Sequence, residues 1–410
     1  METEEHVASR DDRPFIDRGR PPVDGVAPDR SRLEAFARGL AALRAEVAAE
    51  IGADDVAHMK RAERWGRACT ALGYATAWIA PNPVSACLIS LGNTSRWTIM
   101  MHHLGHRAFD DVQGAPSRYH SKRFAAGRRR FIDWADWILP EAWRHEHNVL
   151  HHYHVGEELD PDVVEINTRD IRDAHLPMPL KYAAVAFYAC TWKLTYYAPS
   201  TFLAYVRARE RRSGHAVSEY VRTASYASAF NPLRPLGREF LSRCVVPYVA
   251  YRFVAIPALY APLLPLAPFA SVNVLLNSVA AEVLTNLHTF VVIAPNHAGD
   301  DLYRFDGRSG DPVEHVFRQV VGSANYTGGS DVADFLQGYL NYQIEHHLWP
   351  DLTPLRCREV QPRVKALCEE HGVPYVQESL LRRASRLVDI FVGKTSMKRR
   401  VEQGRREVVS

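Results

Sequence analysis

Residues 68–95 read ACTALGYATAWIAPNPVSACLISLGNTS, a stretch of 28 residues without a charged side chain. A membrane-spanning helix needs about 20 apolar residues, so this stretch is long for one crossing and short for two. Pro81-Asn82-Pro83 lies near its middle and predicts a turn. If the flanking residues extend both arms, we expect a hairpin of two membrane spans over about 65–101, with a single long tilted helix as the alternative.

A second apolar block covers residues 244–296, where Arg252 and Glu282 are the only charged residues. Three prolines break this block near its middle, so it also predicts a hairpin of two spans. The apolar segment 179–206 has basic residues at both ends, which disfavours a full crossing and favours an interfacial or re-entrant helix. The expected fold is an all-α, multi-pass integral membrane protein with about four spans in two hairpins.

The regions outside the apolar blocks are polar. Residues 1–30 mix acidic residues, arginine and proline without an apolar period, and they lack a signal-peptide pattern, so we expect a disordered tail that stays in the cytoplasm. Residues 31–64 have helical apolar spacing and predict an amphipathic helix that packs on the core or on a membrane surface. The membrane domain is expected to cover 65–380, and 381–410 to form a basic C-terminal tail.

The composition excludes one class of function and points to one kind of residue. Lysine and arginine number 50 against 47 acidic residues, a net charge of +3. No broad cationic field is available to bind phosphates, which excludes a generally basic nucleic-acid binder. The sequence has 19 histidines, nine of them between His102 and His154, so we look for the function there.

Three histidine clusters follow the two apolar blocks. In the first two clusters, histidines four residues apart would share one face of a helix, about one turn apart. The clusters contain His102, His103 and His106; His145, His147, His151 and His152; and Gln343, His346 and His347. Two hairpins would place all of them, together with the isolated His288 and His297, on the cytoplasmic side, whereas a fifth crossing at 179–206 would separate the last group.

This pattern favours a metal centre. Imidazole suits iron, copper and zinc, and no cluster contains a thiolate. A single pair of histidines four residues apart is more often a polar helix face, but three clusters on one side of the membrane are hard to explain that way. Six to eight imidazoles exceed the needs of one tetrahedral zinc, so two metal ions are the economical explanation.

The order of the clusters, HxxxH, HxxxHH and QxxHH, resembles that of the membrane-bound fatty acid desaturases. The string Gln343-Ile344-Glu345-His346-His347-Leu348-Trp349-Pro350 is similar to the third box of their front-end branch. The resemblance runs from about His102 to Tyr375 and includes Asp160-Pro161-Asp162-Val163 and Pro295-Asn296-His297. It implies an oxygen-dependent oxidoreductase that introduces a double bond into a fatty acyl chain at a non-haem diiron site, held by histidines in a cytoplasmic helical cap.

The resemblance also implies roles for individual residues. The implied iron ligands, with no catalytic residue separate from them, are His102, His106, His147, His151, His152, His297, His346 and His347. Gln343 would be a weak or water-mediated ligand, and His288 is the rival of His297 for the extra histidine after the last span. We expect His103 to support neighbouring ligands. Glu282 and Asn286, one turn apart at membrane depth, would line the site or join helices by hydrogen bonds.

The departures from the family pattern concern the electron supply and the regiochemistry. The sequence has no HPGG haem motif of a fused cytochrome b5 domain, so electrons are expected from a separate carrier, a ferredoxin or a free cytochrome b5. His103 stands where many front-end members have aspartate. The acyl group could be linked to CoA, a carrier protein or a membrane lipid. The alternatives are a diiron hydroxylase or monooxygenase and, less favoured, a non-catalytic metal-binding membrane protein.

Overall fold

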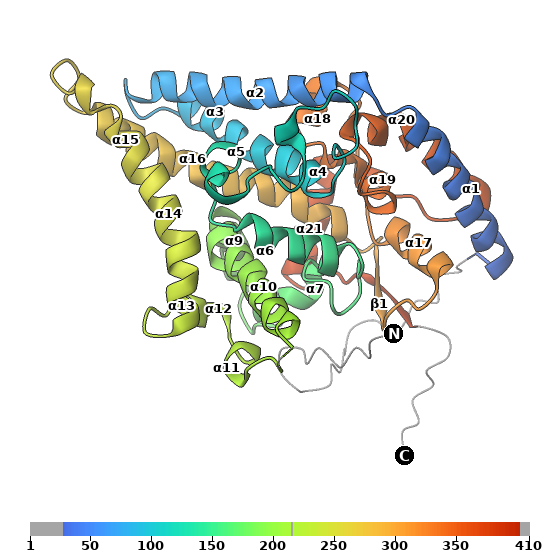
Figure 1. Cartoon of the computed structure of the whole chain (residues 1–410). Helices are drawn as coiled ribbons and strands as arrows, with labels where there is room; N and C mark the ends of the chain where they lie inside the picture. Colours follow the sequence, from blue (N-terminus) through green and yellow to red (C-terminus); the bar gives the residue numbers. More distant parts are fainter. Residues whose placement is uncertain (1–27, 215, 402–410) are drawn as a thin grey trace.

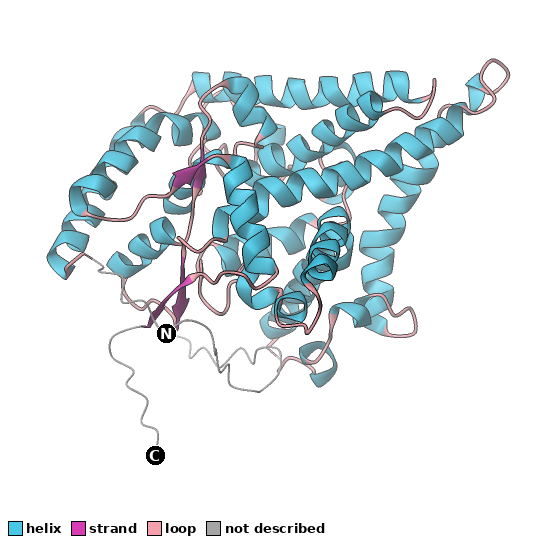
Figure 2. Ribbon diagram, turned by 180° about the vertical axis from the view of Figure 1, so that it is seen from behind, coloured by secondary structure: helices cyan, strands magenta, loops and turns pink. Residues whose placement is uncertain are grey.

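The computed structural model describes residues 28–214 and 216–401, and within these ranges helices form nearly all of the regular structure (Figures 1 and 2). The predicted N-terminal tail lies almost entirely outside the described residues. The strands are short and lie beside the helices without forming a central sheet (Figure 2). The mainly helical fold class is therefore confirmed.

The segment 31–64 forms one helix and part of a second instead of a single amphipathic helix. α1 (Arg30–Ala49) ends before Gly52, which is the N-cap of α2 (Ala53–Ala77) and donates its N–H to Asp55. The apolar face of α1 is buried against α17 (Pro312–Val321) and α20 (Pro354–His371). Of the two roles expected for this segment, packing on the protein core and packing on a membrane surface, α1 therefore has the first.

The first predicted hairpin is present as two packed helices, α2 and α3 (Pro83–Thr94), joined at the Pro-Asn-Pro turn. Asn82 caps α3 by accepting the N–H of Ser85 at 2.8 Å. The helices approach closely at Gly92, where an added Cβ would lie 2.0 Å from the Thr70 hydroxyl oxygen. α3 continues through a π-helical turn, η1 (Ser95–Met101), into α4 (His102–Gly105).

The second predicted hairpin begins earlier than expected, at Pro235. Among the described residues, only Pro235–Leu263 and Ala270–His297 are long and apolar enough to cross a membrane. The first consists of α13 (Pro235–Phe240), η6 (Leu241–Val245), α14 (Val246–Val249), η7 (Ala250–Ala255), α15 (Ile256–Ala258) and η8 (Ala261–Leu263). The second consists of α16 (Ala270–Ile293) and η9 (Ala294–His297). Both hairpins project to the left in Figure 1.

The first hairpin does not meet the same criterion of length and apolar composition. Its charge-free arms, 68–77 and 83–95, extend roughly 15 and 20 Å at 1.5 Å per residue, against a hydrocarbon core of about 30 Å. The prediction of four spans therefore stays a prediction.

The segment 179–206 is helical, as expected. It lies within α9 (Met178–Trp192), η5 (Lys193–Tyr197) and α10 (Ala198–Arg212). α9 packs against α16 and exposes Phe187 on its other side.

The predicted basic tail at 381–410 is wrong for most of its described part. Residues 380–391 form α21 (Leu380–Phe391), and β4 (Lys398–Val401) pairs in parallel with β1 (Tyr303–Asp306). The side chain of Arg383 is fully buried and donates to the carbonyls of Pro295 and Ala298 and to Asp301. Basic side chains thus anchor this segment to the residues that follow α16.

Short elements complete the described chain. β2 (Asn325–Tyr326) pairs in parallel with β3 (Gln377–Glu378). The remaining elements are η2 (Ser117–Tyr119), η3 (Gly127–Arg129), α5 (Arg130–Asp133), α6 (Pro140–His145), η4 (Glu146–His151), α7 (Val164–Asn167), α8 (Arg169–Arg172), α11 (Glu219–Arg222), α12 (Tyr226–Ala229), α18 (Asp331–Leu336), η10 (Leu340–Tyr342) and α19 (Gln343–Leu348).

Candidate metal centre

The three histidine clusters and His297 converge at one place in the fold, on α4, η4, η9 and α19. All eight histidines that the resemblance implies as ligands are buried. They form two donor groups, and within each group the ligand atoms lie within 4.8 Å of one another; a third group of His147, His151 and Asp162 overlaps both. Group A comprises His102, His106, His147, His152 and His346, and group B comprises His151, His297 and His347.

A π-helical turn distributes the histidines of the second cluster between group A and group B. η4 covers Glu146–His151, and the N–H of His152 donates to the carbonyl of His147 at 3.1 Å, five residues earlier. The wider turn brings His152 to the same side as His147, so both belong to group A while His151 joins group B. Such π-turns are frequent at functional sites.

The rings of group B are held by hydrogen bonds at Nδ1. His151 donates to Asp160 at 2.8 Å, His297 to the carbonyl of Gly322 at 3.1 Å, and His347 to the amide oxygen of Gln319 at 3.0 Å. This arrangement points Nε2 of each ring away from these bonds, where it could bind a metal ion, and bonding at the other ring nitrogen is the usual pattern for metal-bound histidine. The amide nitrogen of Gln343 lies 3.2 Å from Nε2 of both His297 and His347.

The rings of group A have few protein partners. Neither nitrogen of His147, His152 or His346 has a hydrogen-bond partner among the described residues. A buried polar atom left unsatisfied costs about 1–3 kcal/mol. The indole of Trp143 stacks on His147, with ring centroids 4.5 Å apart and planes at 21°. Because several buried nitrogens converge without protein partners, the donor set fits a metal.

Electrostatics keep most of these rings in the neutral form that binds metal. Burial lowers the pKa of His147, His152, His346 and His347 well below its usual value, and neighbouring histidines lower it further. Burial acts the same way on His151, but Asp160 and Asp162 outweigh it, so its pKa is raised.

The other predicted residues lie outside the two donor groups. His288 contacts Thr94 and the carbonyl of Leu336, away from the clusters. His103 is buried beside His102 and His346, with ring centroids 5.0 and 5.6 Å away. Two residues that orient ligand rings were not predicted from the sequence: Asp160, which bonds to His151, and Gln319, which bonds to His347.

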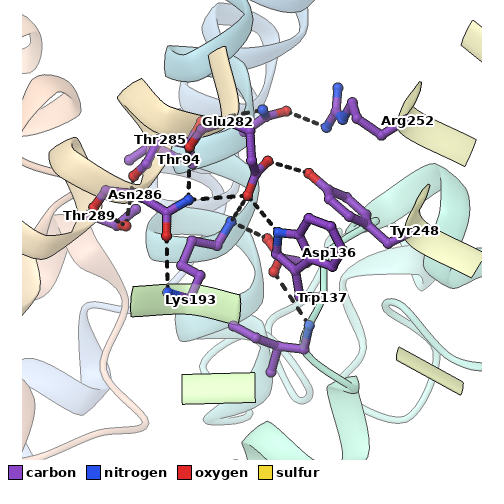
Figure 3. Close-up of polar contacts among 12 residues, drawn as sticks. Thr94, Asp136, Trp137, Lys193, Tyr248, Arg252, Glu282, Thr285, Asn286 and Thr289 are labelled. Carbon is purple, nitrogen blue, oxygen red and sulfur yellow. Dashed lines mark hydrogen bonds and ion pairs between the residues drawn. The ribbon is translucent and has the colours of Figure 1, made fainter. Parts of the chain in front are cut away.

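Glu282 and Asn286 form a polar network between helices, as one of the two expectations for them stated (Figure 3). Glu282 accepts hydrogen bonds from Trp137 at 2.7 Å and Tyr248 at 2.5 Å. The Lys193 ammonium lies 2.7 Å from Asp136 and 3.5 Å from Glu282, and 5.5 Å from the ring of Trp97. Since Trp97 lines the cavity beside the histidines, this network supports the wall of that cavity.

Replacing Lys193 with methionine should destabilise the protein strongly. Two buried carboxylates, Asp136 and Glu282, would lose their shared counter-charge, and breaking a buried ion pair costs about 3–5 kcal/mol. Denaturant unfolding in detergent measures the change. Arg209→Met, which removes an exposed pair with Glu239, is the matched control and should cost less than about 1 kcal/mol. Equal losses in both variants would contradict a structural role for the network.

Comparison with known proteins gives consistent matches. The family model described as fatty acid desaturase matches residues 76–379. A NADPH-dependent stearoyl-CoA 9-desaturase of Mycobacterium tuberculosis is 36% identical over 132 residues, which cover 32% of this chain and 30% of that protein. An acyl-lipid (8-3)-desaturase of Rebecca salina is 43% identical over 68 residues, 16% of each chain. A Delta(8)-fatty-acid desaturase of Euglena gracilis is 35% identical over 99 residues, 23% of this chain and 22% of that protein. The matched segments thus span less than a third of the length of these relatives.

Proposed function

Because the chain belongs to the fatty acid desaturase family, we propose that it is an oxygen-dependent desaturase that introduces a double bond into a fatty acyl chain. The reaction would consume one acyl chain, O₂, two electrons and two protons, and would release the unsaturated chain and two molecules of water. The observation that carries this proposal is the pair of adjacent, buried histidine groups whose ligand nitrogens converge.

We propose that group A and group B each hold one iron ion, with Gln343 as a weak or water-mediated ligand beside group B. When bound, iron and O₂ would supply the oxidising power that no side chain has. The protein residues would bind the metal ions, orient the ligand rings and shield the reacting carbons from water. Asp160, Gln319 and the Gly322 carbonyl fix three imidazole rings, which presets the ligand geometry before metal binds.

A small cavity of about 30 Å³ lies beside both groups. Trp97, Trp143, Ile293 and Leu340 line it together with histidines of both groups. These four apolar side chains would exclude water from the reacting carbons of the acyl chain beside the histidines.

The surface fits a membrane enzyme. Leu259, Leu266 and Phe269, at the tip of the second hairpin, are 75%, 88% and 70% exposed, which is costly in water and favourable in lipid. We propose that 65–380 forms a membrane domain with four spans and a cytoplasmic active site. The name of the mycobacterial relative suggests NADPH as the source of electrons, which a separate ferredoxin or cytochrome b5 would deliver.

Mass spectrometry of total acyl chains from cells that express the protein tests this function. We expect a new species lighter by the mass of two hydrogens, and fragmentation would locate its double bond. Co-expression of a ferredoxin and its NADPH-dependent reductase supplies the electrons. A species heavier by one oxygen atom would instead establish the hydroxylase, and unchanged acyl chains with metal-loaded protein would contradict the proposal.

Exchanging Gln343 for histidine should retain iron and most of the activity. The imidazole places a nitrogen near the position of the amide, next to His297 and His347, so the group B site gains a ligand instead of losing one. Metal analysis and the product assay measure both effects. Complete loss of metal would contradict the weak-ligand role of Gln343.

A further inference from the structure

We propose that four buried tryptophans form a path for single electrons from α9 to group A, and that this path protects the histidine ligands when O₂ reacts without an acyl chain. The inference rests on the proposed function, which supplies the oxidant. It adds a task that substrate conversion does not require, the removal of oxidising power that no substrate has consumed.

The path begins at the ligands of group A. The indole of Trp143 stacks on His147, with ring centroids 4.5 Å apart, and lies 6.0 Å from His102 and 6.2 Å from His106. A Cβ added at Gly105 would lie 2.6 Å from a ring carbon of Trp143, so the ring needs this glycine to approach α4 so closely. An electron that leaves Trp143 is therefore already beside three rings of group A.

Three further indoles continue the path away from the histidines. The ring of Trp134 lies 6.2 Å from that of Trp143 and 6.3 Å from that of Trp97, and Trp97 lies 5.7 Å from Trp192. All four residues are buried, with exposures of 1–5%. They come from α6, the end of α5, η1 and α9, so residues far apart in the sequence form one row of adjacent indoles.

The surroundings of the indoles suit reversible loss of an electron. Indole and phenol are the aromatic side chains that give up one electron most readily, and an indole N–H can only donate a hydrogen bond. The N–H of Trp192 donates to the carbonyl of Asn286 at 2.9 Å, and the N–H of Trp134 has no partner among the described residues. Since neither N–H meets a base, an oxidised indole keeps its proton and is restored by gaining one electron.

The charge beside the path is balanced. The ammonium of Lys193 lies 5.5 Å from the ring of Trp97 and alone would oppose a positive charge on that ring. The same ammonium lies 2.7 Å from Asp136 and 3.5 Å from Glu282. Because these carboxylates offset the ammonium, Trp97 can carry a positive charge briefly.

The electrons and protons of the protective reaction balance. With an acyl chain present, O₂ receives two electrons from the carrier and two electrons with two protons from the chain. Without it, two successive one-electron transfers from Trp143 replace the electrons of the chain, and four protons from water complete two water molecules. Trp134, Trp97 and Trp192 reduce one another in turn towards Trp143. The reduced one-electron carrier that the proposed function requires then restores Trp192.

Electron paramagnetic resonance tests the path during turnover without substrate. Purified, iron-loaded, full-length protein is mixed with ferredoxin, its reductase, NADPH and O₂, and is frozen at intervals. We expect an organic radical whose spectrum narrows when the protein is made with ring-deuterated tryptophan, which identifies an indole. Consumption of O₂ without an indole radical would overturn the path.

Trp134→Phe interrupts the path one step away from the ligands. Phenylalanine keeps a ring at this position and breaks no hydrogen bond, so the iron content should match that of the wild type. The oxidised Trp143 can then no longer be reduced through the path. We expect its peptide to gain an oxygen atom and the protein to lose activity in fewer turnovers. Peptide mass spectrometry and timed product assays measure both effects, and wild-type values for both would overturn the protective role.

Trp65→Phe is the matched control. Trp65 packs on Phe335 at 5.6 Å and has no ring contact with the four tryptophans of the path, so its replacement should change neither the oxidation of Trp143 nor the lifetime of the protein. The proposed function can fail separately. Protein that forms the indole radical but no unsaturated product would contradict only the proposed function, whereas protein that forms the product but no indole radical would contradict only the path.

Discussion

Replacing His346 with alanine should lower desaturated product by more than about 100-fold, since even changes beyond the ligand shell cost 10–100-fold. His346 is 2% exposed and contacts rings on two other segments of group A, with centroids 4.2 Å from His102 and 4.8 Å from His152. Its replacement would remove the proposed ligand that α19 contributes to group A. Product mass spectrometry and metal analysis of membranes measure the two effects.

His288→Ala is the matched control for this prediction. His288 is the rival of His297 in the sequence but lies outside both donor groups, so its replacement should retain metal and product. If His346→Ala retained full activity, or if His288→Ala lost metal as His346→Ala does, the ligand assignment would be contradicted.

Asp160→Asn should lower activity and iron retention about 10–100-fold while the protein still folds. Asp160 accepts from His151 at 2.8 Å and from the backbone N–H groups of Gly156 and Asp162 at 2.9 and 2.8 Å. Asparagine keeps one oxygen acceptor and the size of the side chain but removes the charge that favours His151 as a strong ligand. The readouts are product rate and the half-time of iron loss to a chelator.

Asp110→Asn is the control for Asp160→Asn. Asp110 follows the first histidine cluster as Asp160 follows the second, but it bonds to Ser121 instead of a ligand histidine. Iron loss should be unchanged in this variant. Equal iron loss in both variants would show that the faster loss in Asp160→Asn does not arise from its hydrogen bond to His151.

Much of the fold and site follows from local sequence patterns. The turn at Asn82, the buried face of α1 and the apolar second hairpin are encoded by residues close together in the chain, and they were predicted. The histidine clusters were predicted to meet because each follows an apolar block, and group A and group B contain all eight implied ligands.

The features that sequence reasoning missed depend on contacts between distant segments. Gln319 orients His347 across 28 residues, and nothing in its neighbourhood marks it. Ideal helical spacing predicts that His147 and His151 lie together, and they do, but the π-turn also brings His152 beside His147 in group A, which the spacing does not predict. From its sequence the basic C-terminal segment resembles a solvated tail. In the structure its arginines pair with Asp301 and Asp306, which lie in another part of the chain.

The most direct test of the account is the iron content of the purified, full-length protein measured by plasma mass spectrometry. We expect about two iron ions per chain, one for each donor group, and a loss in both His297→Ala and His346→Ala. A wild-type chain that holds a single metal ion, or two ions that both remain in His297→Ala and His346→Ala, would contradict the two-metal centre on which the proposed function depends.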